Sequence, residues 1–194
     1  MTIERVIDRF IGYLGHEVPV EEDEVANSPW TQEQLFSSKS VEWGTPQALF
    51  DALNQEFGFG LDAAASDTNH KVPHYYTKDD DALTKEWAEE LPSIRDSSAI
   101  WMNPPWGRGI GKWIEKAYNE AQKGLTVVCL LPSCTDTKWW RDYVWKAAQI
   151  RFVTGRLSFV RDDGHTGPCT KGAAIIVFTH WSKGPPSCSL MERV

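Results

Sequence analysis

The sequence has no long hydrophobic run, no paired-cysteine motif and no glycine-rich phosphate-binding loop. Its longest apolar runs, such as residues 173–178, have the length of a strand and fall far short of a membrane span. The N-terminus lacks the pattern of a secretory signal. We therefore expect a soluble, intracellular protein of the cytoplasm with no membrane partner. We also find no internal repeat.

The four cysteines are spaced unlike those of a zinc finger. None of them forms a CxxC pair, and none has a histidine partner at finger spacing. Cys129 lies in the middle of the apolar run at residues 125–131, so we expect a buried free thiol there. The sequence predicts neither a disulfide nor a metal site.

The charge of the chain is divided unevenly along its length. The formal net charge is −7, but residues 1–100 carry 20 acidic and 7 basic side chains, whereas residues 101–194 carry 7 and 13. Net acidity disfavours nonspecific binding of nucleic acid. The basic excess in the second half has two open interpretations, a surface that faces phosphates and ordinary solvated charge.

Composition divides the 194 residues into three parts. Residues 1–40 combine a short amphipathic segment with acidic and polar stretches, and we interpret them as an N-terminal arm of unknown role. Residues 41–181 form the domain proper, with enough hydrophobic residues for a sizeable core. Residues 182–194 are rich in proline, serine and glycine, and we expect a disordered tail.

Hydrophobic periodicity predicts alternating strands and helices in the domain. Strands are expected at residues 59–62, 99–103, 125–131, 151–153 and 173–179, and helices between 46 and 57, at 81–90, and after Gly109 and Thr137. In the first helix, Thr45 supplies the capping oxygen, Pro46 is the first residue and Gly58 ends it. The alternation predicts an α/β fold with a mostly parallel sheet flanked by helices.

The most informative stretch is the apolar strand at residues 99–102, which ends in Asn103, Pro104, Pro105 and Trp106. The two prolines fix the backbone just past the strand and so hold the amide and the nearby carbonyls in place. A rigid amide beside a flat ring suits a planar, hydrogen-bonding group such as a nucleobase. The plain alternative is a strand followed by a proline-rich turn.

A second candidate site follows the strand at residues 59–62. Asp62 is succeeded by Ala63 and Ala64, and small side chains at the carboxyl end of a strand let a ligand approach the backbone. Further on, the three aspartates at residues 79–81 have two compatible interpretations. They stabilise a helix N-terminus, or Asp81 accepts a hydrogen bond from a cofactor.

Taken in order, several motifs resemble those of amino-methyltransferases that use S-adenosylmethionine. They are Trp43-Gly44-Thr45-Pro46, the stretch from Leu61 to Ser66, Asp81-Ala82-Leu83, Asn103-Pro104-Pro105-Trp106, and the segments at residues 130–140 and 155–159. More narrowly, the chain resembles the Dam-like family, the phage-type DNA N-6-adenine methyltransferases. The resemblance covers residues 41–180 and implies a Rossmann-like methyltransferase fold and transfer of a methyl group to the amino nitrogen of a flipped-out adenine in double-stranded DNA.

The resemblance also implies roles for individual residues. The segment with Trp43, Thr45 and Pro46 and the loop with Asp62, Ala63 and Ala64 would bind S-adenosylmethionine, with Asp81 near the adenosine. Asn103 and the Pro104 carbonyl would hold the target amino group, Pro105 would keep the turn rigid, and Trp106 would stack on the base. The family more often has tyrosine at the position of Trp106, and arginine is expected where Cys134 stands.

Contacts with DNA are expected from the basic second half of the chain. Lys138, Trp139, Arg141 and Arg156 lie near predicted strand ends, and residues 161–172 form an excursion that could read sequence. The alternative is that Trp139 and Trp140 belong to the core and that the basic residues are solvated.

Two other function classes stay open. The Asn-Pro-Pro-aromatic motif is shared with amino-methyltransferases that act on RNA or on a protein amide, and an inactive DNA-binding relative would keep the fold without the cofactor. The resemblance suggests a phage or prophage protein acting in the host cytoplasm. The sequence predicts neither the recognition site in DNA nor the oligomeric state.

Overall fold

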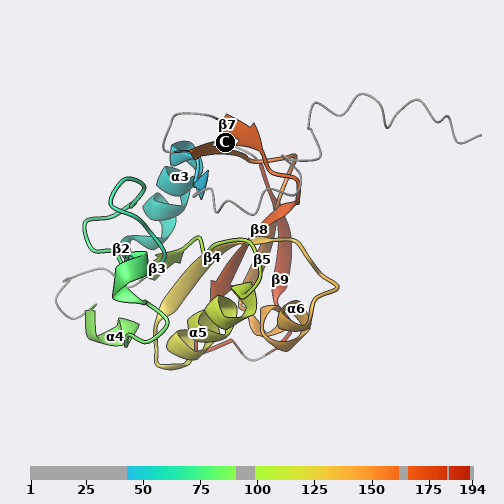
Figure 1. Ribbon diagram of the computed structural model, residues 1–194. Coiled ribbons are helices and arrows are strands. Elements are labelled where there is room, and N and C mark those ends of the chain that lie inside the picture. The colour runs from blue at the N-terminus through green and yellow to red at the C-terminus, as the bar shows by residue number, and fades with distance from the viewer. Residues whose placement is uncertain (1–42, 91–98, 162–165, 183, 193–194) are drawn as a thin grey trace, which may run out of the picture. The chain divides into compact units, whose positions relative to one another are not determined.

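The computed structural model describes residues 43–90, 99–161, 166–182 and 184–192 (Figure 1). The interpretation of residues 1–40 as an arm lies outside these ranges. The described chain forms two sheets, and helices pack on both faces of the larger one.

The larger sheet has six strands in the order β2-β3-β4-β8-β5-β9. Their bounds are Phe59–Asp62 for β2, Ala99–Met102 for β3, Thr126–Pro132 for β4, Gln149–Val153 for β5, Ala173–Phe178 for β8 and Ser187–Met191 for β9. The pairs β2–β3, β3–β4 and β5–β9 are parallel, and β8 is antiparallel to β4 and to β5. The predicted mostly parallel sheet is confirmed.

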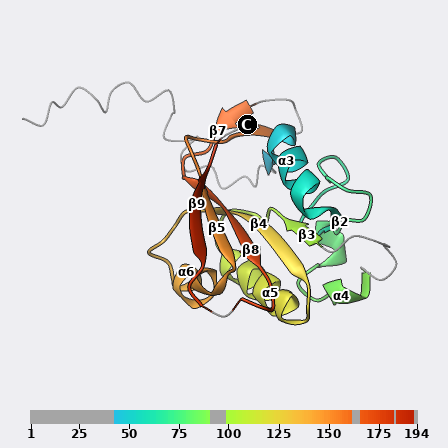
Figure 2. The same ribbon diagram turned by 180° about the vertical axis from the view of Figure 1, so that it is seen from behind.

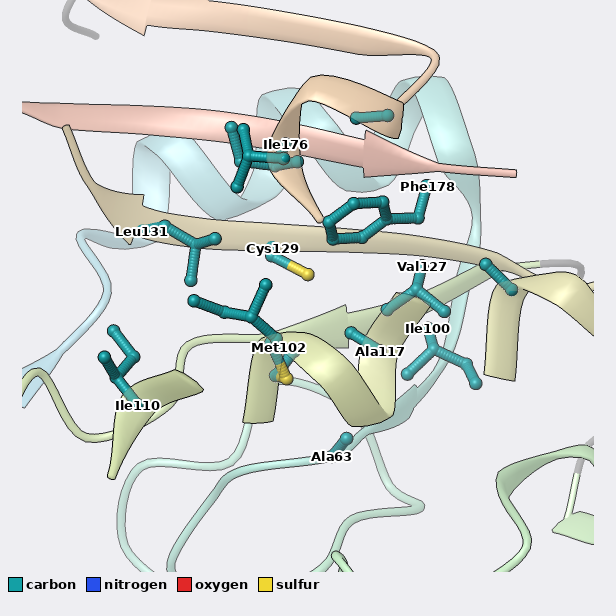
Figure 3. Packing of buried hydrophobic residues seen from close by; sticks show 14 of the residues in the cluster. Ala63, Ile100, Met102, Ile110, Ala117, Val127, Cys129, Leu131, Ile176 and Phe178 are labelled. Carbon is teal, nitrogen blue, oxygen red and sulfur yellow. The ribbon is translucent and has the colours of Figure 1, made fainter. Parts of the chain in front are cut away.

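One face of this sheet is covered by α5 (Ile110–Gln122), α6 (Lys138–Asp142) and the 3₁₀ turn η4 (Val144–Lys146). Every third or fourth residue of α5 is apolar and buried, as the helical period requires. Figure 3 shows Ile110 and Ala117 of α5 in the same cluster as Met102 and Cys129 of the strands. Cys129 is a buried free thiol, as predicted.

The opposite face is covered by α3 (Gln47–Phe57), seen beside the strands in Figure 2. Its residues Leu49, Phe50 and Leu53 belong to the same buried cluster as Trp101 of β3 and Val128 and Leu130 of β4. Alternate residues of β4 therefore point to the two faces, which explains why this strand is apolar over residues 127–131.

The smaller sheet has the order β1-β6-β7 and is antiparallel. Its strands are β1 (Trp43–Gly44), β6 (Ser158–Arg161) and β7 (Thr166–Pro168). In β1, Trp43 pairs with Arg161 and Gly44 with Val160. The segment that precedes α3 is thus joined to the predicted excursion, part of which forms strands.

The start of α3 differs from the prediction by one residue. The helix begins at Gln47, Pro46 occupies the cap position, and no side chain caps the helix. The Pro46 backbone is extended, with ψ of 130°, so its carbonyl accepts the hydrogen bond from the Phe50 amide and the Thr45 cap is not formed. Gly58 ends the helix in a left-handed conformation, as expected.

The helix predicted over residues 81–90 is mostly absent. The 3₁₀ turn η2 (Lys78–Asp80) is followed by turns, and α4 covers only Trp87–Glu90. Asp81 adopts a left-handed conformation with φ of 50°, which an α-helix cannot include. The segment at residues 75–77 contributes a single bridge, between Asp62 and Tyr75.

The prediction of a disordered tail is wrong for residues 187–191. They form β9, which pairs in parallel with the whole length of β5. Backbone pairing gives this segment an ordered partner although its side chains are mostly exposed and its composition is typical of a loop. Within the described residues, no helix is long and apolar enough to cross a membrane.

Candidate active site

The motif at residues 103–106 directly follows β3, which lies between β2 and β4. All four residues of β3 are buried, so the strand is a fixed base for the turn that follows. Asn103 is half-buried, Pro104 is buried and Pro105 is exposed. The carbonyl of Pro105 accepts a hydrogen bond of 3.0 Å from the Gly107 amide, which closes the turn ahead of α5.

The indole of Trp106 is held at two points. Its Nε1–H donates a hydrogen bond of 3.2 Å to the carbonyl oxygen of Leu130 in β4. Its ring meets Phe159 of β6 edge to face, with 5.3 Å between the ring centroids and an angle of 77°. The side chain is half-buried and packs against both core clusters. Its orientation beside Asn103 is therefore set by β4 and by the smaller sheet.

Asp62, at the end of β2, has a buried carboxylate that is only 2% exposed. One carboxylate oxygen accepts a hydrogen bond of 3.3 Å from the Ala64 amide, and the other accepts one of 3.1 Å from the Lys71 amide. Burial raises the pKa of Asp62 to about 6, although the two amide donors act in the opposite direction. Both oxygens of the carboxylate thus bind backbone amides of the loop that follows β2.

The loop after β2 lies against the end of β3. The Ala63 amide donates to the Trp101 carbonyl at 2.9 Å, and the Ala65 amide donates to the Tyr76 carbonyl at 2.9 Å. Ala63 is buried and Ala64 is half-buried. Because β2 and β3 are adjacent and parallel, their carboxyl ends bring the Asp62 loop and the Asn103 turn to the same edge of the sheet.

The first turn of α3 and the segment before this helix each make one contact with the Asp62 loop. Lys71 Nζ donates a hydrogen bond of 2.9 Å to Gln47 Oε1 in the first turn of α3. A Cβ added to Gly44 would lie 3.3 Å from the Val160 carbonyl oxygen and 3.8 Å from Asn69 Cβ, so β1 passes closely between β6 and the Asp62 loop. Thr45 is buried and Pro46 is half-buried.

Of the two roles predicted for the aspartates at residues 79–81, the start of a helix at Asp81 is not found. The Asp81 side chain is exposed, and the residue follows η2 rather than starting a helix. The carboxylate that stabilises this turn belongs to Asp80, whose Oδ2 accepts hydrogen bonds of 2.8 Å from both the amide and the hydroxyl of Thr77. These bonds lower the pKa of Asp80.

The predicted DNA-contacting residues separate into two groups. Arg156 lies at the carboxyl edge of the sheet, the edge at which β2, β3 and β4 end. Its Nη1 would be 3.9 Å from a Cβ added to Gly172. The Gly172 carbonyl in turn accepts a hydrogen bond of 2.9 Å from the amide of Ser133, the residue that follows β4. Lys138, Trp139 and Arg141 lie on α6, where Arg141 pairs with Asp142 at 2.7 Å.

The two tryptophans of α6 differ in burial. Trp140 is a fully buried core residue, as the plain alternative predicted. Trp139 packs on Gly111 of α5. Because it is only half-buried, part of this side chain is at the surface.

Sequence reasoning did not assign roles to three groups that hold this edge together. They are the Leu130 carbonyl, the ring of Phe159 and the Lys71 amide. Phe159 lies within the segment at residues 155–159 that carries the family resemblance, so a signal for it existed. The other two are backbone groups, which leave no trace in the residue pattern. Among the described residues, no cluster of histidine, cysteine or acidic side chains could hold a metal ion.

This chain is similar in sequence to known methyltransferases. A family model described as DNA N-6-adenine-methyltransferase (Dam) matches residues 32–193. A DNA N-6-adenine-methyltransferase of Escherichia phage T1 is 25% identical over 162 residues, covering 73% of this chain and 64% of the phage protein. A DNA N-6-adenine-methyltransferase of Haemophilus phage HP1 (strain HP1c1) is 29% identical over 124 residues, covering 62% of this chain and 67% of the phage protein. The putative methyltransferase YfdM of Escherichia coli (strain K12) is 38% identical over 66 residues, covering 34% of this chain and 70% of YfdM. The chain thus spans just under two thirds of the phage T1 relative.

Proposed function

Because this chain belongs to the DNA N-6-adenine-methyltransferase (Dam) family, we propose that it transfers a methyl group from S-adenosylmethionine to the exocyclic amino nitrogen of adenine in double-stranded DNA. The observation that carries the proposal is the turn at residues 103–106. In this turn, a half-buried asparagine follows the fully buried strand β3, and the nearby indole of Trp106 is held by Leu130 and Phe159.

The fold proposed is the Rossmann-like fold of S-adenosylmethionine-dependent methyltransferases. Its support is the run of three adjacent parallel strands, β2, β3 and β4, with candidate site residues after the first two. Ligands of open α/β sheets bind outside the carboxyl ends of such strands. We assign this domain to residues 41–181, extended by β9.

The carboxyl edge of the sheet has room for S-adenosylmethionine to approach the backbone. The Asp62 loop has small side chains at Ala63 and Ala64, so a ligand can approach the backbone there, and the Asn103 turn lies beside it. We propose that this loop binds the cofactor together with the segment of Trp43, Thr45 and Pro46 and with Asp81. When bound, S-adenosylmethionine supplies an electrophilic methyl group.

Asn103 and Pro104 act on the target amine. The lone pair of an exocyclic adenine amine is delocalised into the ring, which makes it a poor nucleophile. If the Asn103 side-chain oxygen and the Pro104 carbonyl oxygen accept the two amine hydrogens, the nitrogen becomes tetrahedral and its lone pair is released for attack. Holding the nitrogen in this geometry lowers the barrier through positioning and electrostatics.

Trp106 provides a surface for the base, and Pro105 keeps the turn rigid. A base inside a duplex must leave the stack before it reaches Asn103, which costs a few kcal/mol. Stacking on an aromatic side chain returns about 1–3 kcal/mol per base. An indole already held by Leu130 and Phe159 loses little conformational freedom when a base stacks on it.

The proposed DNA contacts are Lys138, Trp139, Arg141 and Arg156. Basic side chains that meet phosphates position a protein on DNA without reading its sequence. Lys138 and the two arginines are exposed, and Trp139 is half-buried. Relatives from two phages support a phage or prophage protein that acts in the cytoplasm of the host.

A competition experiment separates this function from its alternatives. Methyl-labelled S-adenosylmethionine is supplied with equal amounts of unmethylated duplex DNA, RNA and denatured protein, and the label in each is measured. We expect label in DNA, as methyladenine. Label in RNA or protein instead would identify an amino-methyltransferase of another substrate class, and failure to bind the cofactor would identify an inactive relative.

A further inference from the structure

We propose that Asp62 is a positioning residue, whose carboxylate holds the backbone of residues 63–71 in the shape that receives the cofactor and does not itself contact the cofactor. The family resemblance implies only that this loop binds the cofactor. The inference rests on the proposed function, because it assigns the loop to cofactor binding.

The first support is how completely the carboxylate is used within the protein. Asp62 is 2% exposed, and its two oxygens accept the amides of Ala64 and Lys71. Its backbone is also paired, since its amide donates to the His74 carbonyl at 3.0 Å and its carbonyl accepts the Tyr76 amide at 2.9 Å. A carboxylate in this environment closes the loop and presents no oxygen to a ligand outside it.

The second support is where the hydrogen-bonded chain leads. The Lys71 amide is bound to Asp62, and the Lys71 ammonium is bound to Gln47 in the first turn of α3. The residues immediately before Gln47 are Thr45 and Pro46, the other predicted cofactor segment. Asp62 therefore joins the two segments proposed to hold the cofactor through a single residue, Lys71.

The third support is electrostatic. Burial raises the pKa of Asp62. The titratable groups that face it are Lys71 and His70 of its own loop, and Asp51 of α3 faces Lys71. The ionised carboxylate accepts both amides more strongly than the protonated form, because charge-assisted hydrogen bonds are stronger than neutral ones and protonation makes one oxygen a hydroxyl donor. The loop should therefore be held less tightly when Asp62 is protonated.

The test compares Asp62→Asn with Glu120→Gln. Glu120 is the matched control because its carboxylate is also buried, 1% exposed, but lies near the far end of α5 and pairs with Lys116 and Lys123. Binding of S-adenosylhomocysteine is measured by calorimetry at pH 7.5. Hydrogen exchange of the Ala64 and Lys71 amides is measured without ligand.

We expect Asp62→Asn to weaken binding of S-adenosylhomocysteine roughly tenfold or more, because one charge-assisted hydrogen bond to the loop is lost. The Ala64 and Lys71 amides should exchange faster in this variant, and Glu120→Gln should match the parent in both measurements. Parent-like binding by Asp62→Asn, or unchanged exchange, would overturn the inference. If the parent itself does not bind S-adenosylhomocysteine, the proposed function fails as well, which distinguishes the two failures.

A pH series on the parent protein decides the matter if Asp62→Asn does not fold. Affinity for S-adenosylhomocysteine should fall as the pH is lowered through about 6, where Asp62 becomes protonated. His70 lies in the same loop and faces Asp62, so His70→Gln is included and should keep the fall. A constant affinity from pH 7.5 to 5, or a fall that disappears in His70→Gln, would contradict the role of Asp62.

Discussion

The indole Nε1–H of Trp106 donates its hydrogen bond to the carbonyl oxygen of Leu130, across from the turn after β3 to the neighbouring strand β4. The bond fixes the ring proposed to stack on the target base. A phenylalanine ring has no N–H group. Trp106→Phe should keep stacking and lose the bond to Leu130.

Removal of the Trp106 ring should weaken the reaction with DNA and spare the cofactor. We expect Trp106→Ala to lower kcat/KM for duplex DNA by about 10–100-fold, since base stacking is worth ~1–3 kcal/mol, and Trp106→Phe to lower it less. Affinity for S-adenosylhomocysteine should not change. Trp145→Ala is the control, because it also removes an indole, 48% exposed on η4, that is not part of the turn after β3. Equal activity of Trp106→Ala and the parent would exclude stacking.

Two arginines should differ in their contribution to DNA binding. Arg156 lies at the carboxyl edge of the sheet, whereas Arg141 lies on α6. Arg156→Gln should weaken binding to all sequences alike and lower the slope of log affinity against log salt by about 1. Arg141→Gln should change the slope less. Both slopes are measured by fluorescence anisotropy over a salt series. A larger change in slope for Arg141→Gln than for Arg156→Gln would mean that the DNA phosphates lie over α6.

The buried carboxylate of Asp62 should make stability depend on pH. Its pKa is raised to about 6 in the folded protein, from about 3.9 in an unfolded chain. The folded state therefore binds the proton more tightly, so this contribution is fully present below pH 4 and is lost as the pH rises through 6. The loss is on the order of 3 kcal/mol.

The variant Asp62→Asn removes this titration and isolates it from those of other carboxylates. The free energy of unfolding of the parent minus that of the variant, from urea titrations, should decrease between pH 4 and pH 7. A difference that stays constant over this range would mean that Asp62 does not titrate there.

The β9 strand should contribute to stability although the sequence resembles a disordered tail. A chain that ends at residue 183 loses the pairing with β5 and the hydrogen bond from the Thr154 amide to the Met191 carbonyl. We expect the free energy of unfolding to fall by about 3 kcal/mol, the net worth of a few backbone hydrogen bonds. The control is Leu190→Ser, a change at a side chain that is 74% exposed, which should cost under about 0.5 kcal/mol. An unchanged urea midpoint for the shortened chain would show that β9 adds nothing.

The sequence predicted the elements whose residues are apolar at a regular period. The strands around residues 59–62, 99–102 and 126–132 and the helix after Gly109 are long or apolar enough for burial to decide their structure. The family, and with it the importance of residues 103–106, could also be inferred from the order of short motifs.

The sequence could not predict features that depend on backbone partners distant in the chain. Residues 187–191 become a strand because β5 offers an open edge, and their own side chains are mostly exposed. Asp81 follows a 3₁₀ turn capped by Asp80, so three aspartates in a row gave no sign of which one stabilises the turn. Asp62 is tied to the Lys71 amide, a contact that no residue pattern encodes.

The most direct test of the proposed chemistry is nucleoside analysis of unmethylated duplex DNA after incubation with S-adenosylmethionine and either the parent protein or Asn103→Ala. We predict N6-methyladenine with the parent and none with the variant, while both bind S-adenosylhomocysteine with similar affinity. Methyladenine formed at a near-parent rate by Asn103→Ala would contradict the role of the asparagine, and absence of methyladenine with the parent would contradict the proposed reaction.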